Sequence, residues 1–427
     1  MKILFLNHNV KGMGTYIRCF NFAKHLVRFG HSVVILTSTP HRILTPKKEF
    51  IDGVEVIFMP DIVGKRLRNG GLGPIDTILR CLFLLGREFD IVENFDHRPA
   101  VLYPALVSKY LRKMPLVSEW TDLHGTGGSL SNRPMGLQQL IRPYEDFTER
   151  KSKQLPKKLV VISRGLQERA IKLGIPESKI VYIPGGADVE KIVPRLKEEV
   201  RKNLGLPLDK KIIAYTAGTH YDIEFFLKAI NHIQKARKDV VLVTTGVMLD
   251  DKYRGALFDP KRIIELGFLP YEKYTALLPC ADVFVFPFVN SSLNTGRWPN
   301  KIGDYMAAGR PTISNRTGDM VNLFEKHRIG LLASDAPEDF AQKTLHFLSN
   351  EQLSLQVGFN ARKTAEAHYD WRLLSKKLEA SFIEVIDKDR TAVAVQPAIN
   401  PFYRPRKFLM NFLDTIKAFF FNRQKDI

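Results

Sequence analysis

The chain has 427 residues, which exceeds the size of a single compact core and predicts two domains of ordinary size. Lys and Arg outnumber Asp and Glu by 64 to 45, an excess that favours contact with polyanions such as anionic lipid, nucleic acid or phosphorylated substrates. The sequence has no zinc-ligand spacing, no ribonucleoprotein-like segment and no compact basic helix with base-reading residues, so we expect no nucleic-acid partner.

The cysteines and apolar runs predict a cytoplasmic protein. Cys19, Cys81 and Cys280 lie too far apart in sequence for a disulfide framework or a metal cluster, which favours a reducing compartment. The first apolar run breaks at Asn7, too early for a signal peptide. The most apolar internal run (78–85) contains an arginine and is far shorter than the ~20 residues that a membrane-spanning helix needs.

The first half of the chain alternates between strands and helices. Residues 2–6 predict a buried parallel strand that ends in a glycine-containing loop, and a helix follows until Gly30 ends it. This βαβ order implies a parallel sheet. Further strands are predicted at 33–37, 54–59, 90–92, 116–118, 159–162 and 179–183.

A charged stretch (191–211) separates this half from a second half with the same rhythm. The second half predicts helices at 225–236 and 302–308, and strands at 212–216, 240–244, 263–266, 283–287 and 311–314. We therefore predict an α/β fold of two Rossmann-like domains facing a central cleft, because such folds bind ligands at the carboxyl ends of their strands.

Five segments of the chain match known sequence signatures in the correct order. They are KGMGTYIRCFNFAKHLVRFGHSVVILT (11–37), EWTDLHG (119–125), KLVVISRGLQERAIKLGIPESKIVYIPGGAD (158–188), ELGFLPYEKYTALLPCADVFVFPF (265–288) and PNKIGDYMAAGRPTIS (299–314). They resemble the signatures of family 4 glycosyltransferases, and the resemblance covers residues 1–388. Each motif alone is weak, whereas five in order are strong. The resemblance implies the GT-B fold, transfer from a nucleoside diphosphate sugar with retention of configuration, and no required metal or other cofactor.

The resemblance also implies a division of labour along the chain. Residues 1–190 would form the acceptor-side domain and residues 191–370 the domain that binds the nucleotide sugar. A helix at 371–388 would pack back toward the first domain, and residues 389–427 would form a basic amphipathic tail.

The predicted donor-binding residues are glycines and charged groups. The turn around Gly12 and Gly14 could approach the phosphates, although an ordinary βα turn would have the same spacing. Asp304 matches the glutamate that holds the ribose hydroxyls in the resembling enzymes, and Lys301 is placed to offer a cation to a phosphate. A helix cap and an exposed lysine are the alternatives. Two glycines that follow predicted strands of the second half complete the set: Gly218 and Gly246.

The predicted catalytic residues lie on the acceptor side. Asp122 and His124 follow the strand at 116–118, and either could orient the acceptor hydroxyl or the donor sugar. A capping aspartate and a solvent-exposed histidine are the alternatives. His97, after the strand at 90–92, is a further candidate that could equally belong to the core or the surface.

The sequence departs from the family pattern at two places. The arginine and lysine that clamp the diphosphate should fall within Gly218–Glu224, where the chain reads GTHYDIE, and the first glutamate of the donor motif is replaced by Gly296. Lys301, Arg297 and a helix N-terminus could neutralise the charge instead. A non-catalytic partner subunit and a nucleotide-sugar epimerase therefore remain as alternatives.

The end of the chain predicts a membrane partner. From Pro401 on, six basic residues outnumber two acidic ones, and seven large apolar residues recur at helical spacing. This pattern is typical of an interfacial helix on anionic lipid, although a helix that packs on the protein would show it too. We thus expect a glycosyltransferase that acts on a saccharide or lipid-linked acceptor, held peripherally at the inner face of the membrane.

Overall fold

The computed structural model of the protein describes residues 1–128, 135–218 and 222–394. Contacts divide the chain into two compact units. Unit 1 holds Met1–Ile162, Leu166–Ile183 and the chain from Ser375, and unit 2 holds Ser163–Gly165 and Pro184–Leu374. Each unit is an α/β domain with its own largely parallel sheet, which confirms the prediction of two Rossmann-like domains.

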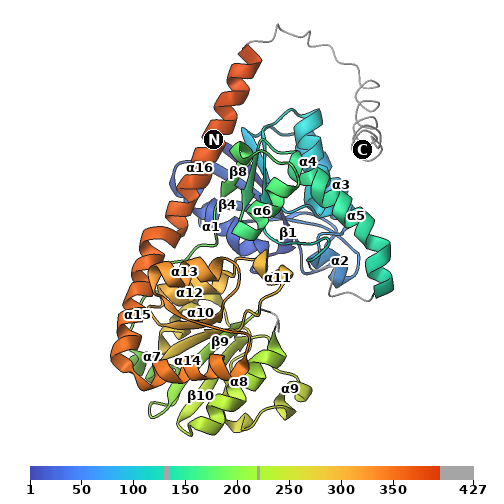
Figure 1. Ribbon diagram of the computed structural model, residues 1–427. Coiled ribbons are helices and arrows are strands. Elements are labelled where there is room, and N and C mark those ends of the chain that lie inside the picture. The colour runs from blue at the N-terminus through green and yellow to red at the C-terminus, as the bar shows by residue number, and fades with distance from the viewer. Residues whose placement is uncertain (129–134, 219–221, 395–427) are drawn as a thin grey trace. The chain divides into compact units, whose positions relative to one another are not determined.

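Unit 1 is built on a sheet of eight strands in the order β3-β4-β2-β1-β5-β6-β7-β8 (Figure 1). Neighbouring strands are parallel except β3 and β4. Its strands are β1 (Lys2–Val10), β2 (Ser32–Ser38), β3 (Lys47–Ile51), β4 (Val54–Met59), β5 (Ile91–Phe95), β6 (Leu116–Trp120), β7 (Lys158–Val161) and β8 (Ile180–Tyr182). Its helices are α1 (Thr15–Arg28), α2 (Lys65–Asn69), α3 (Pro74–Leu85), α4 (Pro99–Leu106) with a π-helical turn (Val107–Leu111), α5 (Met135–Gln154) and α6 (Arg164–Lys172).

The central strand β1 shows why the sheet is covered on both faces. Its apolar residues alternate between faces, as the two-residue period of a strand requires. Leu4 and Leu6 join a buried cluster with residues of α3 and α4. Phe5 points to the other face and meets Phe382 of the last helix with ring centroids 6.4 Å apart. Both faces are apolar, which is the pattern of a buried parallel strand.

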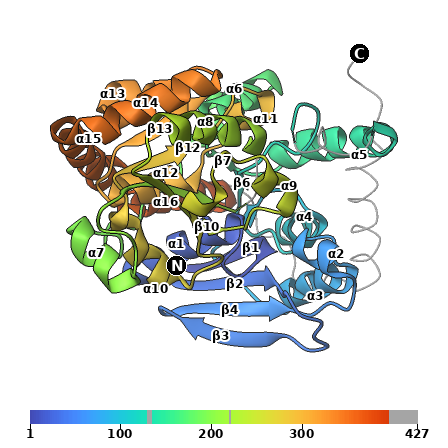
Figure 2. The same ribbon diagram turned by 90° about the horizontal axis from the view of Figure 1, so that it is seen from below.

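The strand predicted over residues 2–6 extends to Val10, because polar side chains within it find partners. Asn7 donates to the hydroxyl of Thr37 at 3.0 Å and accepts from the hydroxyl of Thr15 at 2.7 Å. The prediction also missed β3, which pairs with β4 at the edge of the sheet (Figure 2). Its two lysines lie on this exposed edge, where charge discourages pairing with another chain.

Unit 2 contains a parallel sheet of six strands in the order β11-β10-β9-β12-β13-β14. Its strands are β9 (Lys211–Ala217), β10 (Val240–Gly246), β11 (Ile263–Glu265), β12 (Val283–Phe286), β13 (Thr312–Asn315) and β14 (Gly330–Ala333). Its helices are α7 (Lys197–Leu204), α8 (Ile223–Ala236), α9 (Asp251–Gly255), α10 (Tyr271–Leu277), α11 (Ser292–Thr295), α12 (Asn300–Ala307), α13 (Asp319–His327), α14 (Pro337–Ser349) and α15 (Glu351–Thr364).

Neighbouring residues of β9 again serve opposite faces. Ile213 packs in one cluster with residues of α8 and α14, whereas Ile212 packs in a second cluster with residues of α7 and α10. Helix α7 lies within the stretch that the sequence predicted as a charged linker. It belongs to the domain because Arg201 is buried and forms an ion pair with Asp282 at 2.7 Å.

The last described helix, α16 (Trp371–Ala394), is longer than the predicted 371–388. From Ser375 it belongs to unit 1, where Glu379 contacts His31 at 2.6 Å and Glu384 contacts Lys158 at 2.9 Å. The predicted tail lies outside the described residues from 395 onward. Within the described ranges, no helix combines the length and apolar character that crossing a membrane requires.

Candidate functional site

Lys301 and Asp304 lie three residues apart on α12, and this spacing places them on one face of the helix. Helix α12 can approach the segment after β8 closely because Gly303 has no side chain: a Cβ there would lie 2.2 Å from the carbonyl oxygen of Gly186. Burial lowers the pKa of Lys301, and the charge of Asp304 opposes this shift. Burial also raises the pKa of Asp304 to about 6. The structure thus brings the two predicted residues together.

A chain of hydroxyl groups leads to the Asp304 carboxylate. The phenol of Tyr274 on α10 donates to Oδ2 of Asp304 at 2.8 Å. The Tyr274 hydroxyl is hydrogen-bonded in turn to the side chain of Thr216, near the carboxyl end of β9. Thr216 also contacts the hydroxyl of Tyr305 through its own hydroxyl at 2.8 Å, and donates to it through its backbone N–H at 3.0 Å. We call Thr216, Tyr274, Lys301, Asp304 and Tyr305 the Asp304 group.

A second tyrosine of α10 makes an equivalent contact one turn earlier. The Tyr271 hydroxyl donates to Oδ2 of Asp188 at 2.9 Å, and the Lys191 ammonium lies 5.3 Å from the centre of the Tyr271 ring. Asp188 ends the PGGAD segment that the sequence singled out. Its other oxygen accepts from the backbone N–H of Lys191 at 3.2 Å. Asp188 therefore fixes a turn of the chain, and sequence reasoning missed both tyrosines of α10.

The two predicted glycines of unit 2 lie at the carboxyl ends of neighbouring strands. Gly218 follows β9, and a Cβ at this position would meet no atom within 4 Å. Gly246 ends β10 with a φ of 104°, and its N–H donates to the carbonyl of Gly267 at 2.7 Å. The N–H of Gly246 is thus engaged within the protein. Residues 219–221 of the expected cation clamp lie outside the described part of the chain.

The turn between β1 and α1 holds Gly12 and Gly14, both with positive φ, of 80° and 53°. Asn9 accepts from the backbone N–H of Thr15 at 2.7 Å and so satisfies the first N–H of α1. A Cβ at Gly14 would lie 2.4 Å from this Asn9 oxygen, whereas a Cβ at Gly12 would meet nothing within 4 Å. Gly14 is therefore required by the turn itself, and open space for a ligand exists only beside Gly12.

Buried charges gather at the carboxyl ends of β5 and β6 in unit 1. Asp96, directly after β5, has a φ of 67° and is fully buried. Its carboxylate accepts from the backbone N–H of Thr121 at 3.0 Å and from the Thr121 hydroxyl, and it lies 4.0 Å from the Lys153 ammonium. Burial acts to raise the pKa of Asp96, but the neighbouring His124 and the Lys153 ammonium hold it well below the ordinary value. Asp96 is therefore an ionised carboxylate in the core.

His124 is buried and contacts a charged group at each ring nitrogen. Its Nε2 lies 3.7 Å from Oδ2 of Asp96, and its Nδ1 lies 3.1 Å from Nη2 of Arg98. An arginine can only donate, so Nδ1 must accept and Nε2 must carry the proton that faces Asp96. The interpretation of His124 as a solvent-exposed histidine is therefore wrong. Asp96, Arg98, Thr121, His124, Glu145 and Lys153 are called the Asp96 group below.

The two remaining acceptor-side candidates, Asp122 and His97, lie beside this group. Asp122 is partly buried, and its backbone carbonyl accepts from the Trp120 indole at 3.0 Å. His97 is buried with Nε2 3.6 Å from Oε2 of Glu145, and its ring lies 5.2 Å from that of His124. Burial lowers the pKa of His97 to about 3, so its imidazole is neutral. His97 therefore belongs to the core rather than the surface.

His8 on β1 joins the same edge of the sheet and was missed by sequence reasoning. Its Nδ1 lies 3.1 Å from the carbonyl oxygen of Phe95, which fixes the proton on Nδ1 and leaves a lone pair on Nε2. Burial lowers the pKa of His8 to about 4. The available signal was its place in the segment between the first apolar run and the glycine turn, but a lone histidine in such a segment is common.

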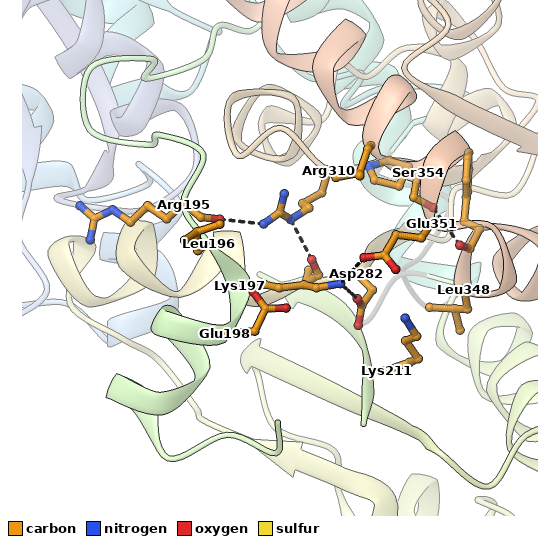
Figure 3. A pocket seen from close by; sticks show the side chains of 14 residues that line it. Arg195, Leu196, Lys197, Glu198, Lys211, Asp282, Arg310, Leu348, Glu351 and Ser354 are labelled. Carbon is orange, nitrogen blue, oxygen red and sulfur yellow. Dashed lines mark hydrogen bonds and ion pairs between the residues drawn. The ribbon is translucent and has the colours of Figure 1, made fainter. Parts of the chain in front are cut away.

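Unit 2 contains a pocket of about 210 Å³, whose lining side chains include Lys197, Asp282 and Arg310 (Figure 3). It lies at the amino ends of the strands, whereas Thr216 of the Asp304 group lies near the carboxyl end of β9. Its lining includes Lys211, which opens β9, and Asp282 and Pro311, which directly precede β12 and β13. The lining residue Arg310, from the YMAAGRP motif, donates to the backbone carbonyls of Ala281 at 2.9 Å and of two other residues. This arginine is thus structural, and the pocket is not the predicted donor site.

Metal ligation has no support in the described ranges, which contain no group of three or more His, Cys, Asp or Glu side chains placed to hold a metal ion.

Two family models match the chain, one in each half. Glycosyltransferase Family 4 matches residues 10–191, and Glycosyl transferases group 1 matches residues 210–350. An uncharacterized glycosyltransferase of Methanocaldococcus jannaschii is 23% identical over 85% of this chain and 92% of its own length. A putative teichuronic acid biosynthesis glycosyltransferase of Bacillus subtilis is 26% identical over 51% of this chain and 56% of its own length.

Solved structures share the fold. Sucrose-phosphate synthase from Thermosynechococcus elongatus aligns with a TM-score of 0.71 at 15% identity, covering 91% of this chain and 99% of that one. Anabaena HepE in complex with UDP and glucose aligns with a TM-score of 0.65 at 16% identity, covering 89% and 99%. The fold is that of GT-B glycosyltransferases. Each half of the chain is thus similar to glycosyltransferases, in its family model and in the relatives that it matches.

Proposed function

We propose that the protein transfers a hexose from a nucleoside diphosphate sugar to a saccharide or lipid-linked acceptor, with retention of configuration. The observation that carries this proposal is that Lys301 and Asp304 lie on one face of α12, close enough for each to affect the pKa of the other. A carboxylate can accept both hydroxyls of a ribose, and an ammonium one turn earlier can meet a phosphate. Anabaena HepE, which shares the fold, was solved with UDP and glucose, which adds support for a nucleotide-sugar donor.

The proposed chemistry is electrostatic and needs no metal. The bond between the anomeric carbon and the phosphate oxygen breaks, and the acceptor oxygen bonds to the same face of the sugar while its proton passes to the departing phosphate. Lys301 and the N–H groups at the start of α12 would stabilise the negative charge on that leaving group. A chelator should then leave transfer unchanged, whereas loss of activity in EDTA that Mg²⁺ restores would contradict this part.

Asp122, His124 and the Asp96 group are proposed to serve the acceptor side. His124 has a fixed tautomer and a fixed ring, so it can offer a constant shape and charge to a sugar hydroxyl. Asp122 sits next to this group on a loop that follows β6, and its carboxylate can accept hydrogen bonds from an acceptor. Because both nitrogens of His124 already face protein groups, we assign it an orienting role rather than that of a base.

The proposed acceptor lies at an anionic membrane, and helix α3 supports this. Its Asp76 and Arg80 are buried as an ion pair, whereas Ile78 and Leu82 are 58% and 55% exposed. Arg80 also donates to the carbonyl of Asn7 at 2.7 Å, so its polar face is held by the sheet. Helix α3 therefore packs Leu84 and its partly buried apolar neighbours on the core, and leaves Ile78 and Leu82, one turn apart, as an exposed apolar stripe that a lipid surface can contact.

A donor screen tests the enzyme proposal. Full-length protein is heated with UDP-glucose, UDP-N-acetylglucosamine or GDP-mannose, and the melting temperature is measured. A bound donor must raise it. Transfer of the sugar to acceptors in lipid and saccharide extracts is then followed by mass spectrometry. Isomerised donor without acceptor would favour the epimerase, and no stabilisation by any nucleotide sugar would favour the non-catalytic subunit.

Vesicle binding tests the membrane proposal separately. The protein should sediment with vesicles that contain phosphatidylglycerol and not with pure phosphatidylcholine. The variant Ile78→Glu/Leu82→Glu should bind at least about tenfold more weakly, because two charges must enter the apolar layer. Leu355→Glu/Phe359→Glu on α15 is the matched control, since these residues are 62% and 59% exposed at the same spacing. Equal loss in both variants would contradict a role for α3.

A further inference from the structure

The Asp304 carboxylate is held at one oxygen only. Tyr274 donates to Oδ2 at 2.8 Å, and in the described part of the chain no hydrogen bond is made to Oδ1. Asp304 is partly buried, so its second oxygen has few water molecules to accept from. A carboxylate fixed in this way presents one acceptor oxygen in a constant direction.

Tyr274 is itself fixed by the protein. Its hydroxyl is bonded to the side chain of Thr216, which is anchored by the hydroxyl of Tyr305 at 2.8 Å. The Tyr305 ring stacks on Phe284 of β12 with centroids 3.9 Å apart. The end of this chain has a defined direction, because the Tyr274 hydroxyl donates to the ionisable carboxyl of Asp304 at 2.8 Å. Every member is buried or partly buried, so the chain has little freedom to rearrange.

We infer that Tyr274 is a positioning residue that aims Asp304 at the ribose hydroxyls of the donor nucleotide. This inference rests on the proposed function, because it assigns the ribose to Asp304. An aspartate has a short side chain that can turn about two bonds, and the phenol removes that freedom before the nucleotide arrives. The preorganised carboxylate then loses little entropy on binding.

Three other titratable groups lie near Asp304, and in the described part of the chain no hydrogen bond joins them to its carboxylate. Lys301 lies on its own helix, Asp188 lies on the segment after β8, and Tyr271 lies one turn from Tyr274 on α10. The Tyr274 hydrogen bond and the Lys301 charge favour ionised Asp304, whereas burial and Asp188 oppose it. Removal of the Tyr274 hydroxyl should therefore make Asp304 harder to ionise.

The experiment compares UDP with 2′-deoxy-UDP by calorimetry at pH 8, using the full chain. The parent protein should bind UDP more tightly than 2′-deoxy-UDP, and Asp304→Asn should bind the two equally. Tyr274→Phe should bind UDP about tenfold more weakly than the parent and should show a smaller preference for UDP over 2′-deoxy-UDP. Tyr271→Phe is the matched control, because it removes the same kind of bond from the same helix but to Asp188. It should leave the preference intact.

A pH profile separates positioning from a merely structural role. UDP-glucose is the probe, because its phosphates do not titrate between pH 5 and 8. Its affinity for the parent should fall by about tenfold per pH unit below pH 6, and in Tyr274→Phe the fall should begin at a higher pH. If Tyr274→Phe has the same pH profile of UDP-glucose affinity and the same preference for UDP as the parent, the inference about Tyr274 is wrong, while the donor assignment is unaffected. No binding of UDP-glucose or UDP to the parent would overturn the donor assignment with it.

Discussion

Arg18 and Glu119, 101 residues apart in sequence, form a buried two-point ion pair in unit 1. Nε of Arg18 lies 2.6 Å from Oε2 of Glu119, and Nη2 lies 3.0 Å from Oε1. Arg18 also donates to the carbonyl of Ile183 at 2.8 Å, so one guanidinium ties α1 to β6 and to the end of β8. Glu93 lies nearby, and burial together with the Glu119 charge raises its pKa well above the ordinary value. Glu93 is therefore protonated, and the guanidinium of Arg18 pairs with Glu119.

Arg18→Met should destabilise the protein by about 3–5 kcal/mol, because it leaves the Glu119 charge buried without its partner. The free energy of unfolding in urea is the measurement. Arg112→Met is the control, since its pair with Glu88 is exposed and should contribute less than about 1 kcal/mol. A double variant, Arg18→Met/Glu119→Met, should recover much of the loss. If Arg18→Met unfolds no more easily than the control, the pair does not hold the domain together.

Asp96→Asn should lower kcat by at least about tenfold while leaving donor affinity unchanged, because Asp96 orients His124 and lies in unit 1. The double variant Asp96→Asn/His124→Ala should lose no more kcat than the more damaging single variant, since the effects of two residues that act as a unit do not add. Steady-state kinetics with a nucleotide sugar and an acceptor extract measures this. Additive losses in kcat would show that the two residues act independently.

Asp304→Asn should raise the melting temperature of the ligand-free protein at pH 8. The folded-state pKa of Asp304 is about 6, above the ordinary 3.8, so folding favours the protonated form. The free-energy cost of burying the ionised Asp304 carboxylate is therefore fully present above pH 6 and disappears as the pH falls toward 3.8. The gain should be at most about 3 kcal/mol, since one pKa unit corresponds to about 1.4 kcal/mol. The same variant should bind UDP-glucose worse, and a variant that is less stable at pH 8 yet equal to the parent at pH 4 would contradict the sign.

Gly12→Ala should cost about 1–3 kcal/mol, because an alanine must adopt a positive φ. Gly14→Ala should cost more, since its Cβ would also collide with Asn9. Gly64→Ala, with open space and no positive φ, is the control and should be close to neutral. If Gly12 faces the phosphates, Gly12→Ala should also weaken UDP-glucose binding beyond what its stability loss explains. Calorimetry below the melting temperature decides this.

Much of the fold follows from local sequence patterns. The run at 54–59 was predicted as a strand and has the same bounds in the structure, because five of its six residues are apolar and all five are buried. The end of β1 was missed, since the polar residues Asn7 and Asn9 find partners in Thr37 and Thr15, which belong to other elements. The edge strand β3 was missed for a similar reason: its charged residues carry no burial signal.

The candidate site was predictable in part. Asp304, Lys301, Asp122 and His124 were predicted as site residues because they lie in motifs with fixed spacing, and their roles remain predictions. The sequence did not indicate a role for Asp96, Arg98, His8 or Tyr274, because each of them contacts a residue that is distant in the chain. Arg98 is an ordinary arginine until the fold places its guanidinium 3.1 Å from the ring of His124.

The amino-acid sequence by itself determined the alternation of strands and helices, the two sheets and the nucleotide-sugar motif, since these depend on apolar periodicity and on residues close together in the chain. Tertiary structure alone decided which charges are buried and paired, because the pKa of a group and the proton position on a histidine depend on neighbours that the fold brings together. It also decided that α3 turns its ion pair inward while Ile78 and Leu82 stay exposed, because the exposure of a helix face depends on the elements that the fold packs against it.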